Sequence, residues 1–361
     1  MTMKRIAIIT FHRADNYGGV LQAFALQKTI MDLGYEVHII DYSPRKICKN
    51  YDLIDTCSLK RFIKSLLTYK ERKSKKNAFD NFRKKNLNIS QSVTYSELSN
   101  FSKRYDKLIT GSDQVWNYEL TASDGVYFLD FVEDSKKKIS YAASFGIADI
   151  PKEKIEWYRE KISSFAQISV REKTGVELVK KLSGRYAEND IDPVFLLKKE
   201  TWESIFNKRP IESKYIFLYM CNTDIINFAK QIADDKNIKI VKLVNAKAVL
   251  HTKLNVGNDY IDLSPEDFLS YIYHADYVLT GSFHAMAFSI IFNKKFMVKS
   301  LDKDGSRIFD LLDITNLQGR LVSNSTALED MYKDINWDCV NRVVYEERRK
   351  SLNNLKRFIE V

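Results

Sequence analysis

The apolar positions at the N-terminus of this chain predict a strand, a helix and a second strand. Residues 3–10 are apolar and β-branched, and residues 37–40 form another short apolar run. Between them, apolar side chains recur at the spacing of one helical face, at Leu21, Leu26 and Ile30. This βαβ opening is typical of a parallel sheet, and the same alternation of elements starts again near residue 214.

Several of the predicted strands end in small or polar residues. The strand 107–110 leads into Gly-Ser-Asp-Gln, the strand 168–170 into Arg-Glu-Lys, and the strand 277–279 into Thr-Gly-Ser. In open α/β proteins the carboxyl ends of parallel strands form the edge where ligands bind. We therefore expect these turns to line a site.

The stretch LTGSFHAMAFSIIF, residues 279–292, carries the most distinctive of these turns. Its helix is predicted to begin at or just after Phe283, which places His284 in the first helical turn. Backbone N–H groups and the helix dipole at such an N-terminus favour a phosphate or a carboxylate. Ser282 and His284 are therefore candidate site residues, although capping or packing would also explain them.

Three other positions have both a functional and a structural interpretation. Asp113 follows a strand, where it can accept a hydrogen bond or a proton, or cap a helix. Arg171 can clamp an anion with its planar guanidinium, or form an ordinary salt bridge. The loop 13–19 ends in Gly-Gly at a helix start and allows close approach of a ligand, although it lacks the GxGxxG spacing of a dinucleotide site.

The repeated alternation predicts the α/β class, with two doubly wound Rossmann-like domains facing across a cleft, as in GT-B glycosyltransferases. We expect an N-terminal domain over residues 1–190, with a basic helical insertion over 60–100, and a C-terminal domain over 191–335. A final helix over 336–361 is predicted to cross back to the first domain.

Composition supports a globular protein: 45% of the 361 residues are hydrophobic and 29% are charged. No apolar window is long enough for a membrane-spanning helix, and the apolar run at the N-terminus is too short for a signal peptide. We therefore expect a cytoplasmic protein. Its four scattered cysteines, Cys48, Cys57, Cys221 and Cys339, predict reduced thiols, and none has the setting of a nucleophile.

The formal charge of +10 is concentrated in residues 60–85, where aromatic and aliphatic residues interrupt a dense basic run. This pattern predicts one or two amphipathic basic helices, which suit an anionic membrane surface or nucleic acid; a solvated helical face explains it equally well. We expect peripheral contact with the inner face of the membrane and no nucleic-acid partner.

Six motifs, in order along the chain, resemble those of the polysaccharide pyruvyl transferase family: NYGGVLQAFAL, GSDQVWN, SYAASFG, SVREK, DPVFLL and SFHAMAFSIIF. The resemblance implies a GT-B-like pair of Rossmann domains and phosphoenolpyruvate as the donor substrate. It also implies transfer of the pyruvyl unit to two hydroxyls of one sugar, as a ketal, during biosynthesis of exopolysaccharide or capsule. The acceptor would be a free sugar or a lipid-linked oligosaccharide.

The family's arginine and histidine correspond to Arg171 and His284 in this chain. Better-known members carry an additional arginine two residues before that histidine, and this chain has Ser282-Phe283 in place of the Arg-Leu pair. Lys299 and Arg307 are our candidates to supply the missing positive charge. With Ser282, these residues form the predicted donor side.

Asp113 is predicted to orient or deprotonate an acceptor hydroxyl, and His284 to act as the acid or the phosphate ligand. The other acceptor residues are expected to be Asp15, Asn16, Gly18 and Gln114. Isolated histidines and the lack of a carboxylate cluster give no reason to expect a metal, and no cofactor is expected.

Three alternatives remain open at this stage. A nucleotide-sugar glycosyltransferase would share the architecture, and a family member could have altered chemistry, for which Phe283 is the main sign. A non-enzymatic adaptor, acting through the basic segment, would bind polyanions in a salt-sensitive way.

Overall fold

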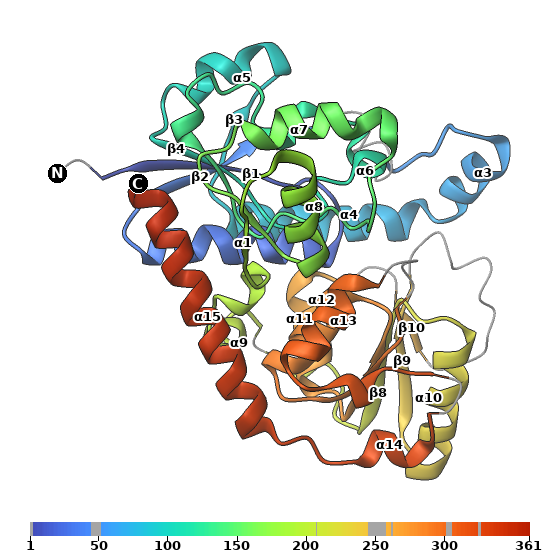
Figure 1. Cartoon of the computed structure of the whole chain (residues 1–361). Coiled ribbons are helices and arrows are strands. Elements are labelled where there is room, and N and C mark those ends of the chain that lie inside the picture. The colour runs from blue at the N-terminus through green and yellow to red at the C-terminus, as the bar shows by residue number, and fades with distance from the viewer. Residues whose placement is uncertain are drawn as a thin grey trace. The chain divides into compact units, whose positions relative to one another are not determined.

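The computed structural model describes residues 3–44, 52–206, 208–244, 258–260, 263–300, 305–323 and 326–361 (Figure 1). By their internal contacts the residues form two compact units. The first comprises Met1–Asn50, Arg83–Leu197 and Tyr345–Val361, and the second comprises Tyr51–Phe82 and Lys198–Val344. Each unit contains a five-stranded parallel sheet with helices on both faces.

The sheet of the first unit has the strand order β3-β2-β1-β4-β5. Its strands are β1 (Arg5–Ile9), β2 (Glu36–Asp41), β3 (Ile89–Ser92), β4 (Lys107–Thr110) and β5 (Lys138–Ser140). A short pair, β6 (Ser169–Val170) and β7 (Glu188–Asn189), continues the sheet through bridges at Ile139 and Ala143. Helices α5 and α7 lie on one face and α1 on the other (Figure 1). The helices are α1 (Tyr17–Asp32), α5 (Tyr95–Ser102), α6 (Tyr118–Thr121), α7 (Ile155–Ser163) and α8 (Lys173–Ser183).

The sheet of the second unit has the equivalent order, β10-β9-β8-β11-β12. Its strands are β8 (Tyr215–Tyr219), β9 (Lys239–Leu243), β10 (Asn258–Tyr260), β11 (Tyr277–Thr280) and β12 (Lys295–Val298). Alternate strand residues face opposite sides: Leu218 packs with residues of α10, whereas the ring of Phe217 contacts Phe268 and Tyr271 of α11. The helices are α3 (Leu59–Leu67), α9 (Lys199–Glu203), α10 (Thr223–Lys236), α11 (Pro265–His274), α12 (Phe283–Ile291), α13 (Ser306–Ile314) and α14 (Leu328–Tyr332).

Helices α4 (Tyr69–Asn86) and α15 (Trp337–Glu360) contribute residues to both units. Short 3-10 turns complete the structure at Gly125–Phe128, Ser135–Lys137, Lys152–Lys154, Pro193–Phe195 and Gln318–Arg320. In both sheets the second and third strands are added on one side of the first strand, and the next two strands are added on its other side. Each therefore has a switch point, between β1 and β4 and between β8 and β11, where open α/β folds bind ligands.

The predicted α/β class and its two Rossmann-like units are confirmed. The predicted strand 107–110 coincides with β4, and the basic segment forms two helices, α3 and α4. Helix α11 starts with a capping box between Ser264 and Asp267, as the sequence SPED indicates. Residues 301–304 and Cys48 lie outside the described residues.

The compact units divide the chain at Leu197, whereas we had expected a boundary after residue 190. The reason is that residues 191–197 are held within the first unit. The turn Pro193–Phe195 packs on α1, and the backbone N–H of Ile191 donates to Ser351 of α15. Residues 345–361 belong to the first unit, and residues 51–82 group with the second.

Candidate functional site

In the first unit, the start of α1 meets the turn that follows β4. Asn16 caps α1, and its Oδ1 accepts a hydrogen bond from the N–H of Gly19 at 3.1 Å. A Cβ atom at Gly19 would lie 3.2 Å from the carbonyl oxygen of Phe11 and 3.4 Å from Oδ2 of Asp113. The glycine therefore lets the two loops approach each other, and Asp113 faces the N-terminus of α1.

Gln114, the residue after Asp113, lies over the loop that follows β5. Asp113 has a positive φ of 82°, and its Oδ1 accepts from the N–H of Gln114 at 2.8 Å. A Cβ atom at Gly146, where φ is 60°, would lie only 2.2 Å from Nε2 of Gln114. Asp113 does not cap the next helix, because Asn117 caps α6. The structure thus brings Asp113, Gln114 and the SYAASFG loop together at one sheet edge.

Arg171 is buried at the end of β6 and forms an ion pair with Asp192. Its Nη1 lies 2.5 Å from Oδ2 of Asp192 and 3.4 Å from Oγ of Ser112. Burial alone would lower the pKa of Arg171, but the negative charge of Asp192 outweighs it, and the pKa is raised. The guanidinium is therefore held by Asp192 and stays charged, and its role toward the donor stays a prediction.

Asp15, Asn16 and Gly18, the other acceptor residues that we predicted, have structural contacts in this unit. Oδ1 of Asp15 accepts from Nη2 of Arg83 at 2.6 Å in a buried ion pair, and Arg83 also donates to the carbonyl of His12. Asn16 is the helix cap, and Gly18 lies in the first turn of α1. These contacts shape the loop, and acceptor binding by the three residues stays a prediction.

A buried polar cluster, not predicted from the sequence, lies beside this loop. Nε2 of His12 lies 3.3 Å from Oδ1 of Asp41, and Nε of Arg13 donates to the same oxygen at 2.7 Å. His12 follows β1 and Asp41 ends β2. Their positions at the ends of two neighbouring parallel strands are the signal that could have revealed the cluster.

Replacing Asp41 by asparagine is expected to reduce the acid sensitivity of the first unit. Burial would raise the pKa of Asp41, but hydrogen bonds from His12 and Arg13, with the charge of Arg13, lower it well below its usual value. Because the folded-state pKa is lowered, Asp41 contributes stability that is fully present above its unfolded-state pKa of about 3.9. This stability is lost as the pH falls below that value toward the folded-state pKa. We expect Asp41→Asn to lower the free energy of unfolding by about 1.5–3 kcal/mol at pH 7. Calorimetry across pH 2–7 should show that the difference in the free energy of unfolding between the variant and wild type shrinks below about pH 4.

In the second unit, hydrogen bonds fix the turn between β11 and α12. Oγ1 of Thr280 donates to the carbonyl of Tyr219 at 2.6 Å and accepts from the N–H of Ser282 at 3.0 Å. Ser282 caps α12, and its Oγ accepts from the N–H of Ala285. The helix therefore begins at Phe283, as predicted, at the switch point between β8 and β11.

His284 lies in the first turn of α12 and is buried, with 7% of its surface exposed. Its ring meets that of Phe283 edge to face, with 5.2 Å between the centroids. All nine residues of α12 are buried. His284 is therefore a polar group with a fixed position in an apolar helix, at the end that favours anions.

Lys299 and Arg307 both lie on segments next to β11 or α12. Lys299 directly follows β12, and its Nζ lies 2.5 Å from Oδ2 of Asp224 in the first turn of α10. Arg307 lies in the first turn of α13, which packs against α12. The charge of Lys299 is thus shared with a carboxylate, and Arg307 is a further cation, on the helix that packs against α12.

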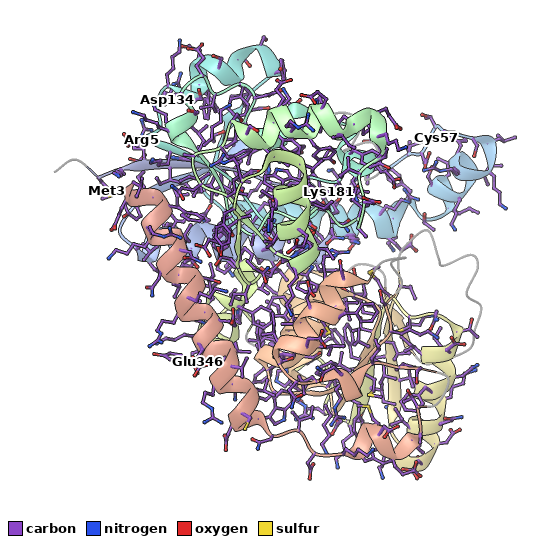
Figure 2. All side chains as sticks on the ribbon, viewed as in Figure 1. Met3, Arg5, Cys57, Asp134, Lys181 and Glu346 are labelled. Carbon is purple, nitrogen blue, oxygen red and sulfur yellow. The ribbon has the colours of Figure 1, made fainter. Side chains whose placement is uncertain are left out.

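Within the described ranges, no three histidine, cysteine, aspartate or glutamate residues are grouped in a way that could hold a metal ion. Cys57, Cys221 and Cys339 are free, and Cys57 is exposed ahead of α3 (Figure 2). Burial raises the pKa of the Cys221 thiol to about 12, so that it stays protonated. No helix among the described residues has the length and apolar character needed to span a bilayer.

The family model described as "Polysaccharide pyruvyl transferase" matches residues 16–302. The chain belongs to this family. The matched range contains the predicted site residues except Asp15 and Arg307, and it includes strand ends of both sheets. A transferase of this family is therefore built on the two Rossmann-like units described above. A search among curated proteins gave no significant match.

Several solved structures have a similar fold. A UDP-N-acetylglucosamine 2-epimerase from Rickettsia bellii has a TM-score of 0.55 at 8% identity, with 100% of this chain and 98% of that chain covered. An α-glucosyltransferase bound to UDP and DNA has a TM-score of 0.50 at 10% identity, with 98% and 95% covered. The S. aureus MnaA–UDP complex has a TM-score of 0.50 at 12% identity, with 91% and 86% covered. At these identities the likeness establishes the fold, which is that of GT-B glycosyltransferases and epimerases.

Proposed function

We propose that this pyruvyl transferase family member uses phosphoenolpyruvate to form a pyruvyl ketal on a sugar during biosynthesis of a surface polysaccharide. The observation that carries the proposal is the family match over residues 16–302, which includes the turns 111–114 and 280–282 and the residues Arg171 and His284. We expect the acceptor to be a free or lipid-linked saccharide.

The second unit has the groups that an anionic donor requires. Phosphoenolpyruvate carries a phosphate and a carboxylate, which require cations and oriented N–H groups. The N-terminus of α12 supplies N–H groups beside His284. Lys299 follows β12, the strand that pairs with β11, and Arg307 lies on α13, which packs against α12; we propose that both add positive charge to this site. Phe283 stands where better-known members have the leucine of their Arg-Leu pair, and we assign the role of the missing arginine to Arg307. Donor binding by Arg171 stays a prediction.

The reaction consists of an addition and then a substitution at C2 of the donor. A general acid protonates the methylene carbon while the first sugar hydroxyl adds to C2 and gives up its proton. The second hydroxyl then displaces phosphate from C2, and its proton leaves with the phosphate. The products are the ketal and inorganic phosphate. His284 can supply the first proton or bind the phosphate, and Asp113 can accept the proton of a hydroxyl.

The decisive experiment is incubation of the purified protein with phosphoenolpyruvate and a panel of free and lipid-linked saccharides. Mass spectrometry of the saccharide and a phosphate-release assay should both report the reaction, and each should require both substrates. If phosphate release does not depend on a saccharide, or if a nucleotide diphosphate but not phosphoenolpyruvate raises the melting temperature, the proposal is wrong. The second result would favour nucleotide-sugar glycosyl transfer, and the position of Phe283 makes altered donor chemistry the other alternative.

Helix α3 supports our proposal that the enzyme contacts the anionic membrane on which lipid-linked acceptors reside. Ser58 caps this helix, and its apolar side chains recur at the spacing of one face. They are exposed: Leu59 by 75%, Ile63 by 49% and Leu67 by 67%. Lys60 and Lys64 stand beside them, so the helix combines an apolar face with positive charge.

Replacing Ile63 and Leu67 together by serine is expected to lower binding to anionic vesicles by at least about tenfold, since each buried apolar side chain contributes about 1.5–3 kcal/mol. Sedimentation with phosphatidylglycerol vesicles measures this. Leu120→Ser, at a similarly exposed leucine of α6, is the matched control and should bind as wild type does. Equal binding by all three proteins would refute the role of α3.

A further inference from the structure

Glu172 is a buried carboxylate at the acceptor edge of the first unit that the sequence analysis did not single out. It directly follows Arg171 after β6, occupies the N-cap position of α8, and is 1% exposed. A buried carboxylate is costly unless hydrogen bonds or opposite charges compensate it. Its two oxygens differ sharply in the hydrogen bonds that they accept.

The first oxygen, Oε1, organises the loop after β5. It accepts hydrogen bonds from Oγ of Ser144 at 3.0 Å, from the N–H of Phe145 at 2.8 Å and from the N–H of Gly146 at 3.1 Å. The same loop is joined to Asp113, whose carbonyl accepts from the N–H of Ser144 at 3.0 Å. Glu172 therefore holds the backbone on which the side chain of Gln114 rests.

The second oxygen, Oε2, is buried and accepts no hydrogen bond from any residue that the structure describes. The carboxylate lies close enough to the guanidinium of Arg171 for their charges to interact. The hydrogen bonds that fix the loop after β5 are all accepted by Oε1. A carboxylate oxygen left without a donor in a protein interior is a site that a donor group of a ligand would stabilise.

We propose that Oε2 of Glu172 binds a hydroxyl of the acceptor sugar, so that Glu172 is an acceptor-binding residue beside Asp113 and Gln114. This inference rests on the proposed function for the identity of the acceptor. Hydroxyls are neutral donors, whereas phosphoenolpyruvate offers only anionic groups that two neighbouring carboxylates would repel. The first-unit edge thus selects a polyol, and the carboxylates discriminate against an anion in the same place.

Glu172→Gln separates the two oxygens. The three donors around Oε1 force the amide oxygen of glutamine into that position, because an NH₂ group there would face two backbone N–H groups. The amide nitrogen then replaces Oε2 and turns an acceptor into a donor. We expect the melting temperature to be nearly unchanged, the KM for the saccharide to rise roughly 10- to 100-fold, and the KM for phosphoenolpyruvate to stay within about twofold.

Glu177→Gln, at an exposed glutamate of the same helix α8, is the matched control and should behave as wild type. An unchanged saccharide KM in Glu172→Gln would overturn the inference, and so would equal rises in both KM values. Saccharide binding is also measured directly by saturation-transfer NMR without phosphoenolpyruvate. If wild type binds saccharide but performs no transfer, the proposed function fails while the loss of binding in Glu172→Gln still tests Glu172.

Discussion

Replacement of His284 by alanine is expected to lower kcat/KM for phosphoenolpyruvate by at least about 10²-fold. Loss of a general acid typically costs 10²–10⁴-fold, and loss of a group that stabilises a developing anion costs a similar factor. His284 is fixed in the first turn of α12, which the Thr280 and Ser282 hydrogen bonds hold in place. No other histidine lies on this helix. Steady-state kinetics of phosphate release with an identified acceptor measures the effect.

The control for this variant is His274→Ala, at a half-buried histidine of α11 whose Nδ1 contacts the carbonyl of Ser270. It should retain activity. The pH dependence of kcat separates the two roles of His284, because a general acid gives a limb that the alanine variant loses, whereas a phosphate ligand mainly changes the donor KM. Full activity of a folded His284→Ala protein would show that His284 is neither the general acid nor the phosphate ligand.

Replacement of Asp192 by alanine is expected to lower the free energy of unfolding of the first unit by about 3–5 kcal/mol. The carboxylate pairs with the buried guanidinium of Arg171 at 2.5 Å and caps the turn Pro193–Phe195 by accepting from the N–H of Val194 at 3.1 Å. Without Asp192, a positive charge remains buried without this partner. Denaturant unfolding followed by circular dichroism measures the loss.

A double variant tests whether the loss of stability comes from the uncompensated charge of Arg171. Arg171→Met combined with Asp192→Ala removes both charges and should be less destabilised than Asp192→Ala alone, because the remaining cost is packing rather than an uncompensated charge. Asp149→Ala breaks an exposed ion pair with Lys181, which lies on the outer surface of α8 (Figure 2), and should leave stability unchanged. A double variant less stable than Asp192→Ala would show that the pair does not act through charge compensation.

The fold could be predicted from the sequence because it rests on local patterns. Buried parallel strands are short apolar runs, and helix starts carry their own caps, such as Ser264 with Asp267 and Ser282 before Phe283. The parallel arrangement then places every strand-end turn at one edge of its sheet. This explains why Asp113, Gln114, Ser282 and His284 could be singled out before any contact was known.

The partners of these residues could not be predicted, because they come from distant parts of the chain. Nothing in SVREK indicates that Arg171 pairs with Asp192, or that Glu172 accepts three hydrogen bonds from the SYAASFG loop. Asp15 has a sequence position suited to a ligand, yet its carboxylate pairs with Arg83, 68 residues away. Sequence patterns report which face of an element is buried, whereas hydrogen-bond partners depend on how elements pack.

The sequence by itself determined the α/β class, the two Rossmann-like units, the family and the strand ends that carry polar groups. Only the tertiary structure decided which polar groups are occupied by internal contacts and which buried groups have no hydrogen-bond partner among the described residues. The physical reason is that a buried charge must be compensated, and its compensating group lies wherever the folded chain brings one close. That is why Asp15 and Arg171 are found in internal ion pairs, and why Glu172 was found only in the folded structure.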